Sequence, residues 1–189
     1  MRKGYQAYKS RLRIEFSHKC GYCETREPEI GGAKSFHIDH YKPKKIFPEL
    51  LCAYENLIYS CRSCNGYKGA YWPTYFEELL GKMIVNPRKD SRDKHIDASG
   101  LKWFGITSQG KWTVKKLRLD SPALSQRRED RMRIEVKIQQ LTSIVENAKI
   151  SLENSRNISS TERETIEKFI EEETKTIESF KRKVSGPMD

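Results

Sequence analysis

The stretch HIDHYKPK (residues 37–44) places two imidazoles and a carboxylate within four positions, and Pro43 and a group of lysines follow at once. Such a density of titratable groups is costly to bury unless the groups are paired or bind a ligand. Phe36 and Ile38 alternate with polar residues, which predicts a strand here, after a turn that begins with two glycines. We therefore interpret this stretch as a functional site, whose partners must come from the flanking sequence.

Two pairs of cysteines with the same spacing, CGYC (residues 20–23) and CRSC (residues 61–64), flank this stretch. Disulfides are rare in a reducing cytosol, so paired C-x-x-C turns indicate metal or redox chemistry. Two such turns can supply the four thiolates of a tetrahedral zinc site. The spacing predicts a structural zinc ion, with independent thiols or a redox pair as the alternatives. The predicted ligands are Cys20, Cys23, Cys61 and Cys64, and the fifth cysteine, Cys52, is expected to be a small core residue.

The net charge of +10 is unevenly distributed along the 189 residues. Residues 1–120 hold 23 Lys and Arg against 13 Asp and Glu, whereas residues 121–189 hold 13 of each. A basic excess of this kind suits a polyanion, most commonly nucleic acid, although an unselective basic surface is the alternative. No run of 18 apolar residues and no signal peptide is present, so we expect a cytoplasmic protein without a membrane segment.

The pattern divides the chain into three predicted parts of an α+β fold. Residues 1–81 are predicted to form the core, with a short N-terminal helix within residues 5–19, the zinc site, and then the order strand, loop, strand, helix. Residues 82–120 are predicted to be a mixed β and loop extension. Its strands are expected at the apolar runs MIV (83–85), LKWFGI (101–106) and WTVKKLRL (112–119).

Residues 121–189 are predicted to form a helical hairpin. The dipeptide SP at 121–122 is typical of a helix start, and an apolar stripe follows it, at Ile134, Ile138, Leu141, Val145, Ala148 and Leu152. A second helix is expected to begin at Thr161, whose spacing to Glu164 fits a capping box. The apolar residues on one face of this second helix can pack on the first helix. Alternatively, the hairpin can serve as an arm that binds a second copy of the chain or another partner.

The motifs CGYC, HIDHYKP, ENLIYSC and CRSCNGYKG follow one another in this order over residues 20–69. In this the chain resembles the HNH endonucleases, which have the ββα-metal fold. The motif H-I-D-H-x-x-P-K is similar to that of the HNH component of anti-phage systems, including the Septu type and ATPase-linked retrons. This similarity extends to about residue 130. The resemblance implies a small zinc-stapled ββα-metal nuclease core, followed here by the C-terminal α-helical hairpin.

The resemblance also implies roles for single residues. His40 would be the general base, and Asp39 and Asn65 would hold a catalytic Mg²⁺ or Mn²⁺. Asn56 would orient the imidazole of His40. His37 would have a secondary role at the metal or face the solvent. Phosphate contacts are expected from Lys42, Lys44, Lys45, Arg62 and Lys68.

The predicted function is therefore that of a metal-dependent endonuclease that hydrolyses phosphodiester bonds of DNA, as the nuclease of an anti-phage defence system. The partner that the resemblance implies is an ABC-type ATPase. The alternatives are a non-catalytic zinc module that binds nucleic acid, and an assembly subunit that docks through its C-terminal hairpin. The sequence leaves open whether RNA is also accepted and whether the protein is a homodimer.

Overall fold

The computed structural model describes residues 4–155 and 158–185, and it confirms an α+β fold. The chain divides into two compact units, Met1–Arg128 and Glu129–Asp189. The helices and strands of the described residues are α1 (Lys9–Glu15), β1 (Phe36–His40), β2 (Leu57–Cys61), α2 (Arg62–Lys68), α3 (Tyr75–Leu79), β3 (Ile96–Asp97), β4 (Phe104–Gly105), α4 (Ser108–Leu117), α5 (Pro122–Asn154) and α6 (Ser160–Ser185).

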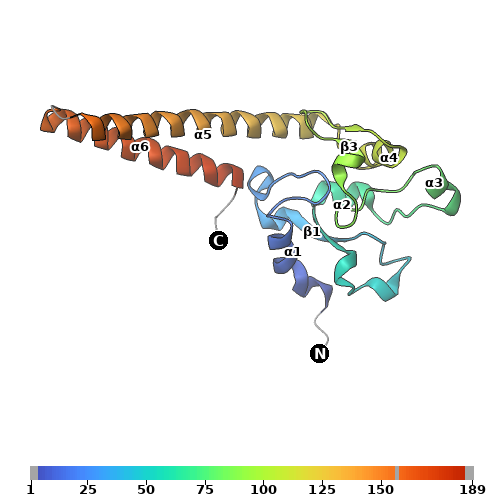
Figure 1. The fold of residues 1–189 in the computed structure, drawn as a ribbon. Coiled ribbons are helices and arrows are strands. Elements are labelled where there is room, and N and C mark those ends of the chain that lie inside the picture. The colour runs from blue at the N-terminus through green and yellow to red at the C-terminus, as the bar shows by residue number, and fades with distance from the viewer. Residues whose placement is uncertain (1–3, 156–157, 186–189) are drawn as a thin grey trace. The chain divides into compact units, whose positions relative to one another are not determined.

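The centre of the first unit is an antiparallel pair of strands followed directly by a helix (Figure 1). Strand β1 pairs with β2 so that Phe36 faces Cys61 at one end and His40 faces Leu57 at the other. Strand β2 ends at Cys61, which is also the N-cap of α2. The predicted order of strand, loop, strand and helix is thus confirmed, and it places the second cysteine turn at the start of α2.

The predicted N-terminal helix is present as a 3-10 turn, Tyr5–Tyr8, that continues into α1. Leu12 of α1 is completely buried, and α1 packs on β2. The chain leaves the helix through Ser17 and His18, which both have a positive φ and turn it toward the first cysteine pair. The helix therefore anchors the N-terminal segment beside the sheet.

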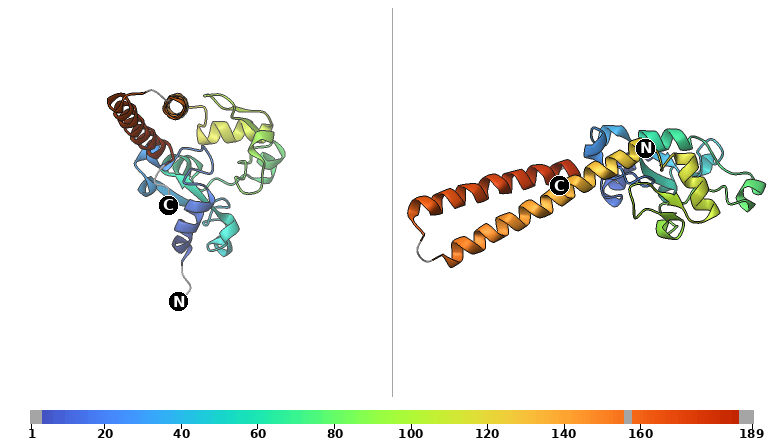
Figure 2. Two further views of the ribbon diagram at one scale, coloured as in Figure 1. Left: turned by 60° about the vertical axis from the view of Figure 1, so that its left-hand side comes forward. Right: turned by 90° about the horizontal axis from the view of Figure 1, so that it is seen from above.

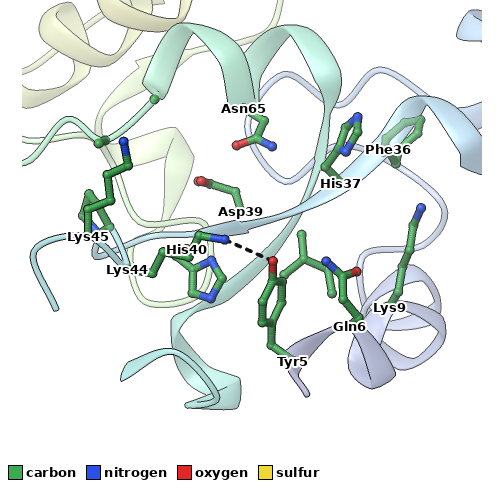
Figure 3. Close-up of a pocket in the computed structure, with 14 residues that line it drawn as sticks. Tyr5, Gln6, Lys9, Phe36, His37, Asp39, His40, Lys44, Lys45 and Asn65 are labelled. Atoms are coloured by element: carbon green, nitrogen blue, oxygen red, sulfur yellow. Dashed lines mark hydrogen bonds between the residues drawn. The ribbon is translucent and has the colours of Figure 1, made fainter. Parts of the chain in front are cut away.

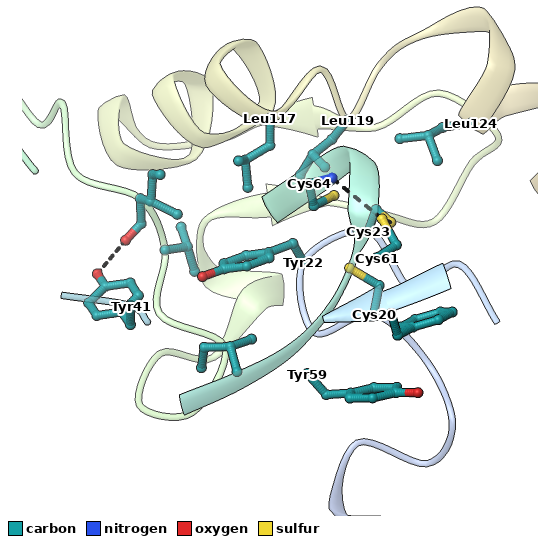
Figure 4. Close-up of a cluster of buried hydrophobic side chains, with 14 of the residues drawn as sticks. Cys20, Tyr22, Cys23, Tyr41, Tyr59, Cys61, Cys64, Leu117, Leu119 and Leu124 are labelled. Carbon is teal, nitrogen blue, oxygen red and sulfur yellow. Dashed lines mark hydrogen bonds between the residues drawn. The ribbon is translucent and has the colours of Figure 1, made fainter. Parts of the chain in front are cut away.

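A single hydrophobic core joins the sheet, the cysteine turns and the extension (Figure 4). Phe36 of β1 stacks on Tyr59 of β2 with the ring centroids 4.8 Å apart. Leu117 and Leu119 of the extension have no exposed surface and belong to the same core. Cys52, expected in the core, is exposed, because the apolar residues around it lie in the loop between the two strands.

The expectation of a strand at residues 112–119 was wrong, because most of this run lies in the helix α4. Thr107 is the N-cap of α4, and its side chain accepts a hydrogen bond from the Gly110 amide at 3.0 Å. The buried positions of α4 recur at helical spacing, and they are Gly110, Thr113, Val114 and Leu117. The expected strand at residues 101–106 is present only as the short β4, which pairs with β3.

The run at residues 83–85 is also not a strand, since its main chain binds side chains instead of a neighbouring strand. The carbonyl oxygen of Ile84 accepts a hydrogen bond from the Tyr41 hydroxyl at 2.6 Å. The amide of Val85 donates to the Thr113 hydroxyl at 2.8 Å. These bonds tie the extension to the strand–helix core at one end and to α4 at the other.

The C-terminal unit contains most of α5 together with α6, and the two helices run side by side (Figure 2). Val145 of α5 and Ile177 of α6 are buried, and Lys137 lies 5.1 Å from the ring centroid of Phe180. Helix α5 begins at Pro122, as predicted from the dipeptide SP. No helix within the described parts of the chain is both long and apolar enough to cross a membrane.

The capping box of α6 lies earlier in the chain than the predicted pair Thr161 and Glu164. The Glu162 amide donates to the Ser159 hydroxyl at 3.2 Å, and the Ser159 amide donates to the Glu162 carboxylate at 3.0 Å. The same spacing of hydroxyl and carboxylate occurs at both pairs, and the earlier pair starts the helix at Ser160.

Candidate active site

The four cysteines of the two C-x-x-C turns converge in the core (Figure 4). Their sulfur atoms all lie within 4.8 Å of one another, and the Sγ atoms of Cys23 and Cys61 are 3.8 Å apart. Tetrahedral zinc with bonds of ~2.3 Å would place its sulfur ligands ~3.8 Å apart. Burial raises the pKa of the Cys20 thiol, and a bound cation would favour the thiolate form. The cluster therefore fits a zinc clip.

A cavity of about 370 Å³ lies beside the sheet, and polar groups from several elements line it (Figure 3). Asp39 and His40 come from the end of β1, and Asn65 comes from α2. Figure 3 shows the side chains of Asp39 and Asn65 in the space between β1 and α2. Three residues that the resemblance singles out thus meet in one cavity.

The ring of His40 is held by the loop between the two strands. Its Nε2 lies 2.9 Å from the carbonyl oxygen of Leu51, and the ring of Tyr5 meets it edge-on at a centroid distance of 4.7 Å. Burial lowers the pKa of His40, the bond to Leu51 opposes this shift, and the charge of Lys44 adds to it. The imidazole is therefore predominantly neutral at pH 7.

Asp39 is buried and carries two partners in the described structure. The Tyr22 hydroxyl donates to its Oδ2 at 2.6 Å, and the Lys68 ammonium lies 3.2 Å from Oδ1 and 3.1 Å from Oδ2. Burial raises the pKa of Asp39, and the charge of Lys68 opposes that rise. Both oxygen atoms of the carboxylate are thus engaged by hydrogen-bond donors.

Lys68, which was expected to contact phosphate, is buried beside Asp39. Only 2% of the residue is exposed, and its ammonium also donates to the carbonyl oxygen of His40 at 2.7 Å. Burial lowers the pKa of Lys68, and the carboxylate of Asp39 opposes the shift. Lys68 is buried because it lies one helical turn after the buried Cys64, on the inner face of α2.

The resemblance implied that Asn56 orients the imidazole of His40, but the side chain of Asn56 forms its hydrogen bonds with the main chain of Lys42. Its side-chain oxygen accepts from the Lys42 amide at 2.8 Å, and its side-chain nitrogen donates to the Lys42 carbonyl oxygen at 3.0 Å. Asn56 therefore fixes the chain that follows His40, and Leu51 takes the role of orienting the ring.

The remaining predicted residues lie around the cavity in different ways. His37 is the exposed residue of β1 and lines the cavity, as do Lys44 and Lys45. Lys42 does not line it, and its ammonium lies over the rings of Phe47 and Trp72. Arg62 is exposed at the start of α2, outside the cavity lining.

Sequence reasoning missed three contributors: Tyr5, Tyr22 and the carbonyl group of Leu51. Tyr22 lies between the zinc-clip cysteines, so its position next to the cluster was a usable signal. The Leu51 carbonyl and the Tyr5 ring contact His40 because the fold brings distant segments of the chain together. No local sequence motif indicates these contacts.

Residues 20–70 match the sequence model of the HNH endonuclease family. This segment is an HNH endonuclease domain. The domain contains the cysteine cluster, the strands β1 and β2, the helix α2, and the polar residues Asp39, His40 and Asn65.

Two curated relatives to which the chain is similar carry the same name. The chain is 34% identical to the Septu protein PtuB of Bacillus thuringiensis, over 55% of this chain and 37% of the relative. It is 26% identical to the Septu protein PtuB of Bacillus mycoides (strain KBAB4), over 65% of this chain and 50% of the relative. The chain thus spans half the length or less of these relatives. No solved structure matches it.

Proposed function

We propose that this protein is a metal-dependent endonuclease that hydrolyses phosphodiester bonds of DNA. The observation that carries the proposal is the convergence of Asp39, His40 and Asn65 in one cavity of the HNH domain. Hydrolysis of a phosphodiester needs an activated water and groups that compensate the charge of the transition state. The cavity contains candidates for both tasks.

His40 is the proposed general base. Its Nε2 donates to the Leu51 carbonyl, because a carbonyl oxygen can only accept a hydrogen bond. In the neutral ring, Nδ1 therefore carries the lone pair that takes a proton from the attacking water. The lowered pKa of His40 keeps this atom unprotonated at neutral pH.

Asp39 and Asn65 are the proposed ligands of a catalytic Mg²⁺ or Mn²⁺. A carboxylate and an amide oxygen suit such a hard cation, and the buried, hydrogen-bonded carboxylate of Asp39 is held in a fixed position. When bound, the ion would polarise the phosphoryl group and stabilise the leaving oxygen. His37, which lines the cavity two residues before Asp39 on the same face of β1, is retained as a secondary contact.

The basic residues near the cavity are the proposed phosphate contacts. Lys44 and Lys45 line it, and the Lys44 ammonium donates to the Tyr5 hydroxyl at 3.1 Å, which holds the ammonium close to His40. Lys42 and Arg62 lie farther out and would act on neighbouring phosphates. A surface with this basic excess would attract nucleic acid over a distance.

The biological setting that we propose is anti-phage defence in the cytoplasm, with an ABC-type ATPase as partner. The support for it is the similarity to Septu proteins. The C-terminal hairpin is the proposed docking element, since α5 exposes Met132, Val136, Ile144 and Ile150. The same surface could join two copies of the chain, and two nuclease sites would allow both DNA strands to be cut.

The decisive experiment is cleavage of a supercoiled plasmid with Mg²⁺ or Mn²⁺, by the unchanged protein and by His40→Ala. We expect metal-dependent nicking that His40→Ala reduces by at least about a hundredfold. His95→Ala is the matched control, because His95 bonds to Thr107 outside the cavity. Zinc content and a thermal melt show that each variant is folded. Absence of cleavage by the folded protein, both alone and with the ATPase and ATP, would overturn the proposal.

A further inference from the structure

A group of cations outside the cavity lies against aromatic rings instead of carboxylates. The guanidinium of Arg118 is 4.9 Å from the ring centroid of Tyr67, and the ammonium of Lys116 is 5.0 Å from that of Tyr71. Trp112 packs on Tyr71 with a centroid distance of 5.7 Å. Tyr67 lies in α2 and Tyr71 follows it, whereas Trp112, Lys115 and Lys116 lie in α4 and Arg118 is its C-cap. We refer to these residues as the α2–α4 seam.

The charge of the α2–α4 seam is uncompensated. The arginines Arg13, Arg88 and Arg92 elsewhere in the same unit form ion pairs with glutamates. Within the described residues, by contrast, Lys115, Lys116 and Arg118 form no ion pair with a carboxylate. Neither α2 nor α4 contains an acidic residue. The cations are thus available for an anion from outside.

The backbone conformation of Arg118 also indicates that its side chain serves to bind an anion. Arg118 is the C-cap of α4 and adopts the left-handed conformation with φ 52°, where glycine is the usual residue. The chain carries a long cationic side chain at a position that glycine would occupy more easily. Contact with Tyr67 then orders this side chain before any ligand binds, which lowers the entropy cost of binding.

The nuclease cavity and the α2–α4 seam lie on the two flanks of α2. Asn65 lines the cavity, and Tyr67, two residues later, is exposed about 200° further around the helix. The diameter of an α-helix with its side chains is about 10 Å. The major groove of B-DNA is about 12 Å wide and admits an α-helix, so a duplex that straddles α2 can contact the cavity on one flank and the seam on the other.

We propose that the α2–α4 seam is a second phosphate-binding surface, which holds duplex DNA beside the nuclease cavity. The proposal deepens the proposed function and rests on it. The ligand is the sugar–phosphate backbone, because cations already lie over the faces of Tyr67 and Tyr71 and leave little room for base stacking. Contacts to phosphate carry no sequence preference. The seam would therefore position many different substrates equally.

The test is binding of a fluorescein-labelled DNA duplex in the His40→Ala background, which separates binding from cleavage. We expect Lys115→Gln/Lys116→Gln/Arg118→Gln to weaken binding by roughly tenfold or more at low salt. The slope of log K against log salt should decrease by about one for each cation removed. The matched control, Lys149→Gln/Lys168→Gln/Lys181→Gln, removes the same charge from exposed positions of α5 and α6 and should change the affinity by less than about twofold.

A second pair of variants tests the geometry of the seam. Tyr67→Ala removes the ring below Arg118 and should weaken duplex binding, whereas Tyr67→Phe retains the ring and should bind normally. In the cleaving protein, the seam substitutions should raise KM and leave kcat unchanged. Unchanged affinity and salt slope in the triple seam variant would overturn the seam proposal alone. Failure of the His40→Ala parent to bind duplex DNA would overturn the DNA nuclease and the seam together.

Discussion

The Nε2 atom of His40 lies 2.9 Å from the main-chain carbonyl oxygen of Leu51. The loop between the two strands thereby determines which ring nitrogen carries the proton, because the carbonyl cannot donate. The edge-on ring of Tyr5 restricts the imidazole from another side. The base of the proposed reaction is thus oriented by main chain and packing and needs no side-chain partner.

The tautomer of His40 is the first prediction. At neutral pH the imidazole of His40 should carry its proton on Nε2 and none on Nδ1. Nitrogen-15 chemical shifts of the imidazole distinguish the two tautomers. The signals are assigned by their loss in His40→Ala. A dominant Nδ1–H tautomer would contradict the geometry and remove Nδ1 as the general base.

The second prediction concerns the buried pair of Lys68 and Asp39. Lys68→Met should lower the free energy of unfolding by about 3–5 kcal/mol, because it leaves the carboxylate of Asp39 buried with only the Tyr22 hydroxyl as a partner. Urea unfolding measures the effect. The double variant Asp39→Asn/Lys68→Met should recover part of this loss, since it removes both charges. Equal stability of Lys68→Met and the unchanged protein would show that the ammonium does not compensate Asp39.

Sequence reasoning was most successful where the residues lie close together in the chain. The cysteine turns, the order of strand, strand and helix, and the meeting of Asp39, His40 and Asn65 all lie within the 51 residues of the HNH domain. Cysteine spacing and strand alternation describe local geometry, so they predict such an arrangement well.

Roles that depend on the path of the chain were predicted less well. Lys68 was expected to contact phosphate, and its spacing of four from Cys64 places both residues on the buried face of α2. Asn56 binds the main chain of Lys42, which is distant in the sequence and carries no motif for this contact. Short apolar runs such as residues 112–119 are ambiguous between strand and helix, and the cap at Thr107 resolves this one.

Zinc removal is the third prediction. The unchanged protein should contain about one zinc ion per chain, and Cys61→Ser should lose it and melt more than about 10 °C lower, because the clip joins β2 and α2 to the first cysteine turn. Cys52→Ser is the matched control, since Cys52 is exposed and lies outside the cluster. Zinc content from metal analysis and a thermal melt check the prediction. Retention of the zinc ion by Cys61→Ser would exclude the four-cysteine site.

The fourth prediction concerns the pH dependence of stability at the buried Glu27. Burial alone would raise the pKa of Glu27, but hydrogen bonds from Arg13 at 2.8 Å and from Tyr59 at 2.6 Å hold it below its usual value of 4.5. A group with a lowered folded pKa stabilises the protein above its unfolded pKa, and this stabilisation disappears as the pH falls through the folded pKa. Glu27→Gln should therefore lower the free energy of unfolding by about 3 kcal/mol at neutral pH, and by progressively less as the pH falls below 4.5.

Urea unfolding of the unchanged protein and of Glu27→Gln over a pH series measures this difference. The exposed Glu49→Gln or Glu153→Gln is the control for a general loss of charge. A constant difference between the two proteins down to acidic pH would mean that Glu27 stabilises the fold through packing and not through its charge.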